Sequence, residues 1–142
     1  MEMPVHSLII PVYKNEENIP SLLDAINKLN QKIDDFEVVF VVDGSPDLSY
    51  EILLKELPQH LFSSQLILLS RNFGSFAAIR RGLESAKGQL FAVMAADLQE
   101  PPHLIEDFFA MLDEGDNDIV VGVRGRRDDP LLTTFMSKGF WT

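Results

Sequence analysis

The chain has 142 residues, no cysteine and a formal net charge of −10 at neutral pH. The negative charge argues against nucleic acid as the main partner, because phosphate backbones are bound by clustered Lys and Arg. The lack of cysteine excludes disulfides and thiolate metal sites. The N-terminus carries no secretory signal, and no apolar run reaches the ~18–20 residues of a membrane helix, so we expect one cytoplasmic domain over residues 1–142.

Buried strands and amphipathic helices alternate in the first part of the chain. Residues 7–12 and 37–42 are short, continuously apolar runs, typical of strands buried on both faces of a parallel sheet. Between them, Asn18 is a good N-cap for a helix whose apolar positions recur at helical spacing as far as Ile33. A second helix is expected over residues 48–57.

Three further strands are expected after these helices. They cover residues 66–69, 90–96 and 118–122, each of which is apolar and of strand length. Strand and helix therefore alternate along the whole chain, which predicts a doubly wound, mainly parallel α/β sheet with right-handed crossovers.

Helices separate these later strands. Residues 76–87 form one, with Gly88 as its expected C-terminal cap. The apolar stripe of residues 104–112 forms the next, and Gly115 ends it.

Polar side chains follow the strands, at the point where each strand ends. Tyr13, Asp43, Arg71, Asp97 and Arg124 each come just after an expected strand. Because the carboxyl ends of parallel strands meet at one edge of the sheet, these five residues should converge there whatever the strand order. That edge is the predicted functional site.

Asp97 and Gln99 are the candidate metal ligands. An extended backbone would point two side chains that are two residues apart in the same direction, so these two could hold one hard cation. The alternative is that Asp97 caps the helix that starts near Pro102.

Several other kinds of α/β site are excluded by their missing motifs. The turn after the first strand has no Gly-x-Gly-x-x-Gly, and the chain contains neither a P-loop nor a Gly-x-Ser-x-Gly nucleophile elbow. The histidines His6, His60 and His103 are scattered without metal-ligand spacing and are expected to be structural or exposed. What remains is an aromatic ring, carboxylates, a cation site and arginines, a set that suits a nucleoside diphosphate.

Five segments resemble, in order and spacing, the family-two glycosyltransferases, close to the dolichyl- and polyprenyl-phosphate sugar transferases. The segments are Ile10-Pro-Val-Tyr-Lys-Asn-Glu-Glu-Asn-Ile19, Val41-Val-Asp-Gly-Ser-Pro-Asp47, Leu69-Ser-Arg-Asn-Phe-Gly74, Met94-Ala-Ala-Asp-Leu-Gln-Glu-Pro-Pro102 and Val121-Gly-Val-Arg124. They cover nearly the whole chain. The resemblance implies a GT-A-like, Rossmann-related fold that binds a nucleotide sugar.

The resemblance also implies roles on the nucleoside side. Pro11, Tyr13 and Glu16 would contact the base and the ribose, with the Tyr13 ring against the base; the alternative for Tyr13 is a core position. Asp43 would accept a hydrogen bond from the base, a role that is compatible with capping its own turn.

On the diphosphate side, the resemblance implies that Asp97 and Gln99 hold Mg²⁺ or Mn²⁺. Arg124 would help to neutralise the leaving nucleotide, and Arg71 and Ala96 would complete the nucleotide site. The reaction implied is sugar transfer from a nucleotide-diphosphate donor to an acceptor, which in the polyprenyl-phosphate branch is a lipid phosphate at the cytoplasmic face of a membrane.

Two positions depart from the family's pattern. Ala95 stands where an Asp-x-Asp element would have its first carboxylate, and Val42 stands where the first Asp of Asp-Asp-Gly-Ser is expected. An alternative function is therefore a catalytically inactive nucleotide-sugar-binding module.

We expect the domain to continue past Thr142. The catalytic base would lie there, so this chain alone should be inactive. Its last apolar residues would pack on that further part or on a membrane surface. They are Leu131, Phe135, Phe140 and Trp141.

Overall fold

The structure is a computed structural model, and it describes residues 4–123. In chain order the elements are β1 (His6–Val12), α1 (Ile19–Lys32), β2 (Phe36–Val42), α2 (Ser49–Glu56), the short 3-10 helix η1 (Leu57–Gln59), β3 (Ser63–Leu68), α3 (Ser75–Ser85), β4 (Leu90–Val93) and α4 (His103–Asp113). None of the helices in this part of the chain is long and apolar enough to cross a bilayer.

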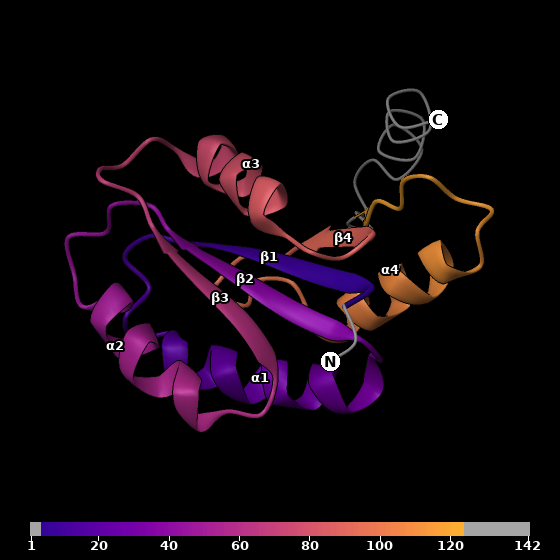
Figure 1. The fold of residues 1–142 in the computed structure, drawn as a ribbon, viewed down its shortest axis with the longest axis horizontal. Helices are drawn as coiled ribbons and strands as arrows, with labels where there is room; N and C mark the ends of the chain where they lie inside the picture. Colours follow the sequence, from indigo (N-terminus) through magenta and orange to yellow (C-terminus); the bar gives the residue numbers. More distant parts are fainter. Residues whose placement is uncertain (1–3, 124–142) are drawn as a thin grey trace, which may run out of the picture.

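The strands form one parallel, four-stranded sheet in the order β3-β2-β1-β4. The chain moves outward from β1 to β2 and β3, and then returns to place β4 on the other side of β1 (Figure 1). The predicted doubly wound α/β fold is therefore confirmed. Its strand order reverses between β1 and β4, and ligands of open α/β sheets bind at such switch points, beyond the carboxyl ends of the strands.

Helices cover both faces of the sheet. Helix α3 lies on one face, while α1, α2 and α4 lie on the other (Figure 1). The larger core cluster joins β1 and β2 to the apolar stripe of α1 and to Ile105 and Phe109 of α4. In the smaller cluster, Ala78 of α3 packs on Val39 and Val41. The continuously apolar sequences of β1 and β2 follow from this arrangement, because both of their faces are buried.

The strands differ from the prediction at three places. β4 ends at Val93 rather than residue 96, where the chain turns away, and β3 begins at Ser63, ahead of the apolar run that predicted it. The fifth strand expected at residues 118–122 is not formed, since this segment has no helix or strand structure. Ile119 and Val121 are 56% and 38% exposed. A β-branched run becomes a strand only where a neighbour offers backbone hydrogen bonds.

Two predicted helix caps also differ. Asn18 occupies the N-cap position of α1, but its side chain makes no capping hydrogen bond and instead accepts one from Asn15. Helix α3 ends at Ser85, so Gly88 is not its cap. A Cβ on Gly88 would lie 2.5 Å from Ser7 Oγ, so close packing on β1 is what requires glycine there. Gly115, with φ +83°, ends α4 as expected.

A buried carboxylate fixes the amino end of the sheet. Glu37 of β2 accepts hydrogen bonds from the Ser7 hydroxyl and the Lys87 amide, both at 2.6 Å, and from Gln65 at 3.0 Å. Burial alone would raise the pKa of Glu37, but these hydrogen bonds and the Lys87 charge outweigh it and lower the pKa. Glu37 is therefore structural, and it lies at the edge away from the expected site.

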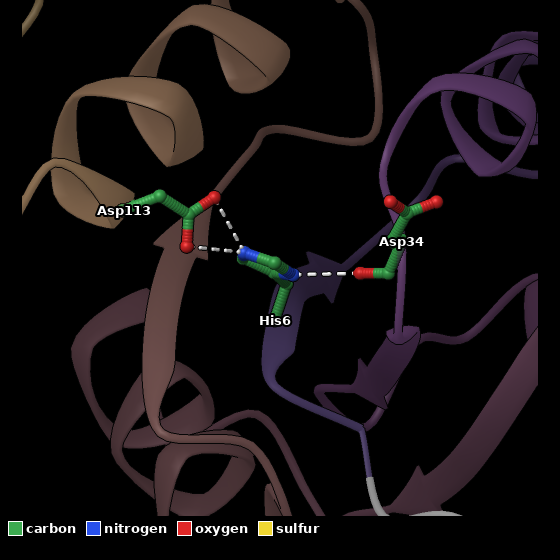
Figure 2. Close-up of polar contacts among 3 residues, drawn as sticks. All are labelled: His6, Asp34 and Asp113. Carbon is green, nitrogen blue, oxygen red and sulfur yellow. Dashed lines mark hydrogen bonds and ion pairs between the residues drawn. The ribbon is translucent and has the colours of Figure 1, made fainter.

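His6 holds the far end of α4. Figure 2 shows its ring between the Asp34 carbonyl, 2.7 Å from Nδ1, and the Asp113 carboxylate, 2.9 Å from Nε2. The His6 ring also packs edge-on against the Phe109 ring, with 4.9 Å between the ring centroids. Carbonyl and carboxylate oxygens only accept, so both contacts are hydrogen bonds when both ring nitrogens carry a proton. His6 has the structural role that the sequence suggested.

Candidate functional site

An open cleft of about 240 Å³ lies at the switch point, beyond the carboxyl ends of β1, β2 and β4. Its lining comes from the loops that follow all four strands. The lining residues are Pro11, Val12, Tyr13, Asn15, Asp43, Asn72, Gly74, Ser75, Ala95, Ala96 and Asp97. Segments far apart in the sequence therefore meet at the edge where the sequence predicted a site.

Five of the predicted site residues line this cleft together. They are Pro11, Tyr13, Asp43, Ala96 and Asp97. Glu16 does not line the cleft but a separate polar hollow of about 430 Å³, together with Lys14, Pro46 and Asp47. The two hollows flank the loop between β1 and α1.

The other three predicted residues are not among those that line the cleft. The Arg71 guanidinium lies over the Phe73 ring, 4.1 Å from its centroid. Gln99 is exposed in the loop after β4. Arg124 lies outside the described residues, as do the expected apolar residues 131–141.

Tyr13 lines the cleft. It is 39% exposed, so it is not a core tyrosine, and the Lys14 ammonium lies 5.4 Å from the centroid of its ring. The Tyr13 amide donates to Asn15 Oδ1 at 2.8 Å, which turns the chain immediately after β1. The ring thus projects from a loop with a defined path.

Asp43 is buried at the base of the cleft and supports one of its walls. Its two carboxylate oxygens accept the amides of Phe73 and Gly74 at 2.8 and 3.0 Å. Each oxygen has a further lone pair, so these bonds leave acceptor capacity for a ligand. The next residue, Gly44, has φ +60°, and a Cβ there would lie 2.2 Å from the Arg71 backbone. The β2–α2 turn therefore packs directly against the loop after β3.

Asp97 sits in a tight turn rather than in extended chain. Its Oδ1 accepts the Gln99 amide at 3.2 Å, and Leu98 between them has φ +58°. The prediction that Asp97 and Gln99 point the same way on an extended backbone was therefore wrong. The alternative, an N-cap of α4, is also wrong, because α4 begins at His103 and its N-cap position is Pro102.

The charged side chains of the cleft lining are acidic, which suits the cation and diphosphate that the sequence predicted. Among the described residues, the lining includes the carboxylates of Asp43 and Asp97 but no Lys or Arg. No group of three or more His, Asp or Glu side chains gathers to hold a metal in residues 4–123. A hard cation at Asp97 would therefore need most of its oxygen ligands from the diphosphate and from water, as Mg²⁺ and Mn²⁺ usually accept. The donor chemistry fits such a metal.

Several lining residues were missed from the sequence. Asn15 braces its own loop by donating to Asn18 at 3.0 Å, and Asn72, Gly74 and Ser75 form the wall that Asp43 supports. The available signal was the presence of Asn72, Gly74 and Ser75 in the segment between the third strand and an amphipathic helix.

A second hollow is larger than the cleft and has a different set of lining residues. It measures about 440 Å³ and lies between β4 and α4, against Met94, Leu104 and Phe108. It shares Ala95 with the smaller cleft, but among its lining residues only Glu100 carries a charge, whereas Asp43, Asn72 and Asp97 come together at the smaller cleft from three loops. The smaller cleft is therefore the candidate site.

Fold and cleft together define a doubly wound α/β domain with a ligand site at its topological switch point. The family model described as glycosyl transferase family 2 matches residues 7–141, and the chain belongs to this family.

Named relatives agree with this family. The undecaprenyl-phosphate 4-deoxy-4-formamido-L-arabinose transferase of Pseudomonas fluorescens is 39% identical over 139 residues, covering 95% of this chain and 40% of that protein. The Salmonella choleraesuis protein of the same name is 38% identical over 136 residues, covering 93% of this chain and 40% of that protein. The chain thus spans about 40% of the length of these curated relatives.

Solved structures agree in fold. S. aureus TarS in complex with UDP-GlcNAc matches with a TM-score of 0.65 and 27% identity, over 86% of this chain and 36% of that one. The mannosyltransferase PcManGT from Pyrobaculum calidifontis, in complex with GDP-Man and Mn²⁺, matches with a TM-score of 0.71 and 21% identity. The match covers 94% of this chain and 39% of that one. The latter is a likeness of fold alone.

Proposed function

We propose that this chain is the donor-binding part of a glycosyltransferase that moves a sugar from a nucleoside diphosphate to a polyprenyl phosphate. The observation that carries the proposal is the meeting of Tyr13, Asp43 and Asp97, from three separate loops, in one cleft. The names of the curated relatives support the acceptor class, and the TarS complex supports a nucleotide-sugar donor.

Each part of the cleft suits one part of the donor. The half-exposed Tyr13 ring would stack on the base, Asp43 would accept a hydrogen bond from it, and Pro11 and Glu16 would border the ribose. Asp97, with Gln99 following it, would hold Mg²⁺ or Mn²⁺ against the diphosphate. Bound there, the metal would supply charge stabilisation for the departing nucleotide.

Groups outside residues 4–123 would complete the reaction. Arg124 would add a cation beside the leaving nucleotide, and we expect the catalytic base beyond Thr142. A polyprenyl phosphate is held in a membrane, so transfer would take place at a membrane surface, for which we propose the cytoplasmic face.

Calorimetry with UDP and GDP, with and without Mn²⁺, tests donor binding. We expect one of them to bind, and more tightly with Mn²⁺, because the cleft lining offers the diphosphate no Lys or Arg. Tyr13→Ala should weaken binding by about 1–3 kcal/mol, the usual value of stacking on a base. Phe91→Ala is the matched control, since Phe91 of β4 is a 41% exposed aromatic that does not line the cleft. No binding of either nucleotide at millimolar concentration would refute the proposal.

A second candidate function is an inactive nucleotide-sugar-binding module. Ala95 lines the cleft, so its methyl group stands where the family's second carboxylate would approach the metal. Val42 is fully buried in the core and offers no polar group to the cleft. Transfer to undecaprenyl phosphate by the full-length protein would exclude this candidate, whereas donor binding without any transfer would favour it.

A further inference from the structure

Three successive amides of the loop after β1 are each bound by a side chain from the β2–α2 loop or the first residue of α2. The Lys14 amide donates to Ser45 Oγ at 2.7 Å, the Asn15 amide to Ser49 Oγ at 3.2 Å, and the Glu16 amide to Asp47 Oδ2 at 3.1 Å. The partners are more than 30 positions apart in sequence. Residues 45–49 thus hold the backbone amides of residues 14–16 in the neighbouring loop.

Asp47 is the centre of this arrangement. Besides the Glu16 amide, its carboxylate accepts the Ser45 hydroxyl at 2.5 Å and the Ser49 amide at 3.1 Å, both through Oδ1. The Ser45 hydroxyl thus donates its proton to Asp47 while its oxygen accepts the Lys14 amide. Partial burial would raise the pKa of Asp47, but the bonds from Ser45, Ser49 and the Glu16 amide outweigh it and lower the pKa to about 2. The carboxylate therefore stays charged at any physiological pH.

The loop that is held needs such support. Lys14 has φ +55°, a left-handed conformation that is unfavourable for a residue with a Cβ. Tyr13 and Asn15, on either side of it, both line the cleft. If the three amides were released, Lys14 could return to a common conformation, and the Tyr13 ring would move with the backbone.

We propose that Ser45, Asp47 and Ser49 form a clamp that fixes residues 13–16 and thereby sets the affinity and selectivity of the cleft for the nucleobase. The inference rests on the proposed function, because it assigns these three side chains to base recognition without placing any of them on the ligand. Asp47 is then a positioning residue. Asp97, on a different loop, should not depend on the clamp.

Asp47→Asn is the sharpest test variant because it keeps the size of the side chain. An amide has a single acceptor oxygen, so its NH₂ group must face either the Glu16 amide or the donors from Ser45 and Ser49. One side of the clamp is therefore lost. Asp107→Asn, at an exposed position of α4, is the matched control, since it removes the same charge away from both loops.

Two measurements on the full chain decide between a clamp and a merely structural role. The first is hydrogen exchange of residues 14–16, which should be at least tenfold faster in Asp47→Asn and unchanged in Asp107→Asn. The second is the ratio of the affinities for UDP and GDP in the presence of Mn²⁺. We expect the preferred nucleotide to bind about tenfold more weakly in Asp47→Asn and the ratio to move toward one. A merely structural defect would lower both affinities by the same factor and leave the ratio unchanged.

The outcomes separate the clamp from the function on which it rests. If wild type binds one nucleotide preferentially and Asp47→Asn keeps both the affinity and the ratio, the clamp is wrong while the donor site stands. An unchanged ratio with equal losses also overturns it. If wild type binds neither nucleotide, or both equally, base recognition at this loop fails whatever the exchange rates show. Should Asp47→Asn not fold, Ser45→Ala removes the bonds of Ser45 to the Lys14 amide and to Asp47 while the Asp47 carboxylate is kept, and the same ratio decides.

Discussion

The loops on the two sides of the cleft contain the same kind of strain but are restrained differently. Lys14 in the β1–α1 loop and Leu98 in the β4–α4 loop have φ of +55° and +58°. Three amides around Lys14 are bound by another loop. Around Leu98 the backbone amides make local and long hydrogen bonds: Leu98 N to Ala95 O at 3.4 Å, and Gln99 N to Asp97 Oδ1 at 3.2 Å.

Because of this difference, we expect the two loops to respond differently to a bound ligand. A loop braced from outside is already in its binding conformation, so a ligand that meets it loses little free energy to ordering. A turn whose backbone bonds are local, as at Leu98, gains more from a ligand that bridges it to the rest of the site. We therefore expect the base side of the cleft, the β1–α1 loop with Tyr13, to be preformed. The metal side, the β4–α4 loop with Asp97, should be completed by the metal and the diphosphate.

Gly44→Ala should have the largest effect, because it breaks the support of the braced side. The added Cβ would lie 2.2 Å from the Arg71 backbone, in a residue with φ +60°. Backbone cannot rotate away as a side chain can, so we expect a loss of about 3 kcal/mol or more of unfolding free energy. Denaturant unfolding measures it.

Gly115→Ala is the control for this substitution. Gly115 also has a positive φ, +83°, but a Cβ there meets nothing within 4 Å. It should lose only about 1 kcal/mol, the conformational part. Equal losses in the two variants would show that the contact between the turn and the Arg71 backbone is unimportant.

Asp47 of the clamp should make the unfolding free energy of the protein depend on pH. The pKa of Asp47 is about 2 in the folded protein, whereas the ordinary pKa of an aspartate side chain is 3.8. Because the folded value is the lower one, the carboxylate contributes stability that is fully present above about pH 4 and is lost as the pH falls toward 2. Asp47→Asn should cost about 2 kcal/mol at pH 6, a usual value for hydrogen bonds to a charged group.

Urea unfolding of wild type and Asp47→Asn between pH 2 and pH 6 measures this contribution. The difference between the two proteins should shrink steadily below pH 4. A difference that stays constant to pH 2 would mean that the ionised carboxylate is not what holds the loop.

The site's location could be predicted from the sequence, because it depends on a pattern that survives without coordinates. Buried strands that each end in a polar residue must deliver those residues to one edge of a parallel sheet, and Tyr13, Asp43 and Asp97 do meet there. The same argument failed for Arg71. Its place after the third strand is as predicted, but its side chain turns onto Phe73 instead of into the cleft.

Other features depend on partners that are distant in sequence. The clamp pairs Lys14 with Ser45, and no local rule links an amide to a hydroxyl 31 positions away. The missing fifth strand is a similar case, since strand formation requires a neighbour to pair with. The direction of Asp97 depended on the conformation of Leu98, and nothing in the identity of a leucine indicates a positive φ.

The metal side gives the smallest expected effect and the most direct test of the comparison. One carboxylate at Asp97 is a weak site for a free divalent cation, so Mn²⁺ should bind poorly alone and better once a nucleoside diphosphate is present, each ligand helping the other by the same factor. Ala95→Asp places a second carboxylate in the same cleft lining and should tighten Mn²⁺ about tenfold, or about 1.4 kcal/mol. Asp97→Ala should remove the metal dependence of nucleotide binding.

Titration of Mn²⁺ with and without UDP or GDP, in wild type and both variants, distinguishes these cases. The matched control is Ala77→Asp, which adds a carboxylate at an exposed position of α3 away from the cleft lining. If Mn²⁺ affinity is the same in wild type, Ala95→Asp and Asp97→Ala, then Asp97 is only a turn residue. If Mn²⁺ instead binds tightly to wild type without nucleotide, the metal side is already complete, and the contrast between the two loops does not extend to ligand binding.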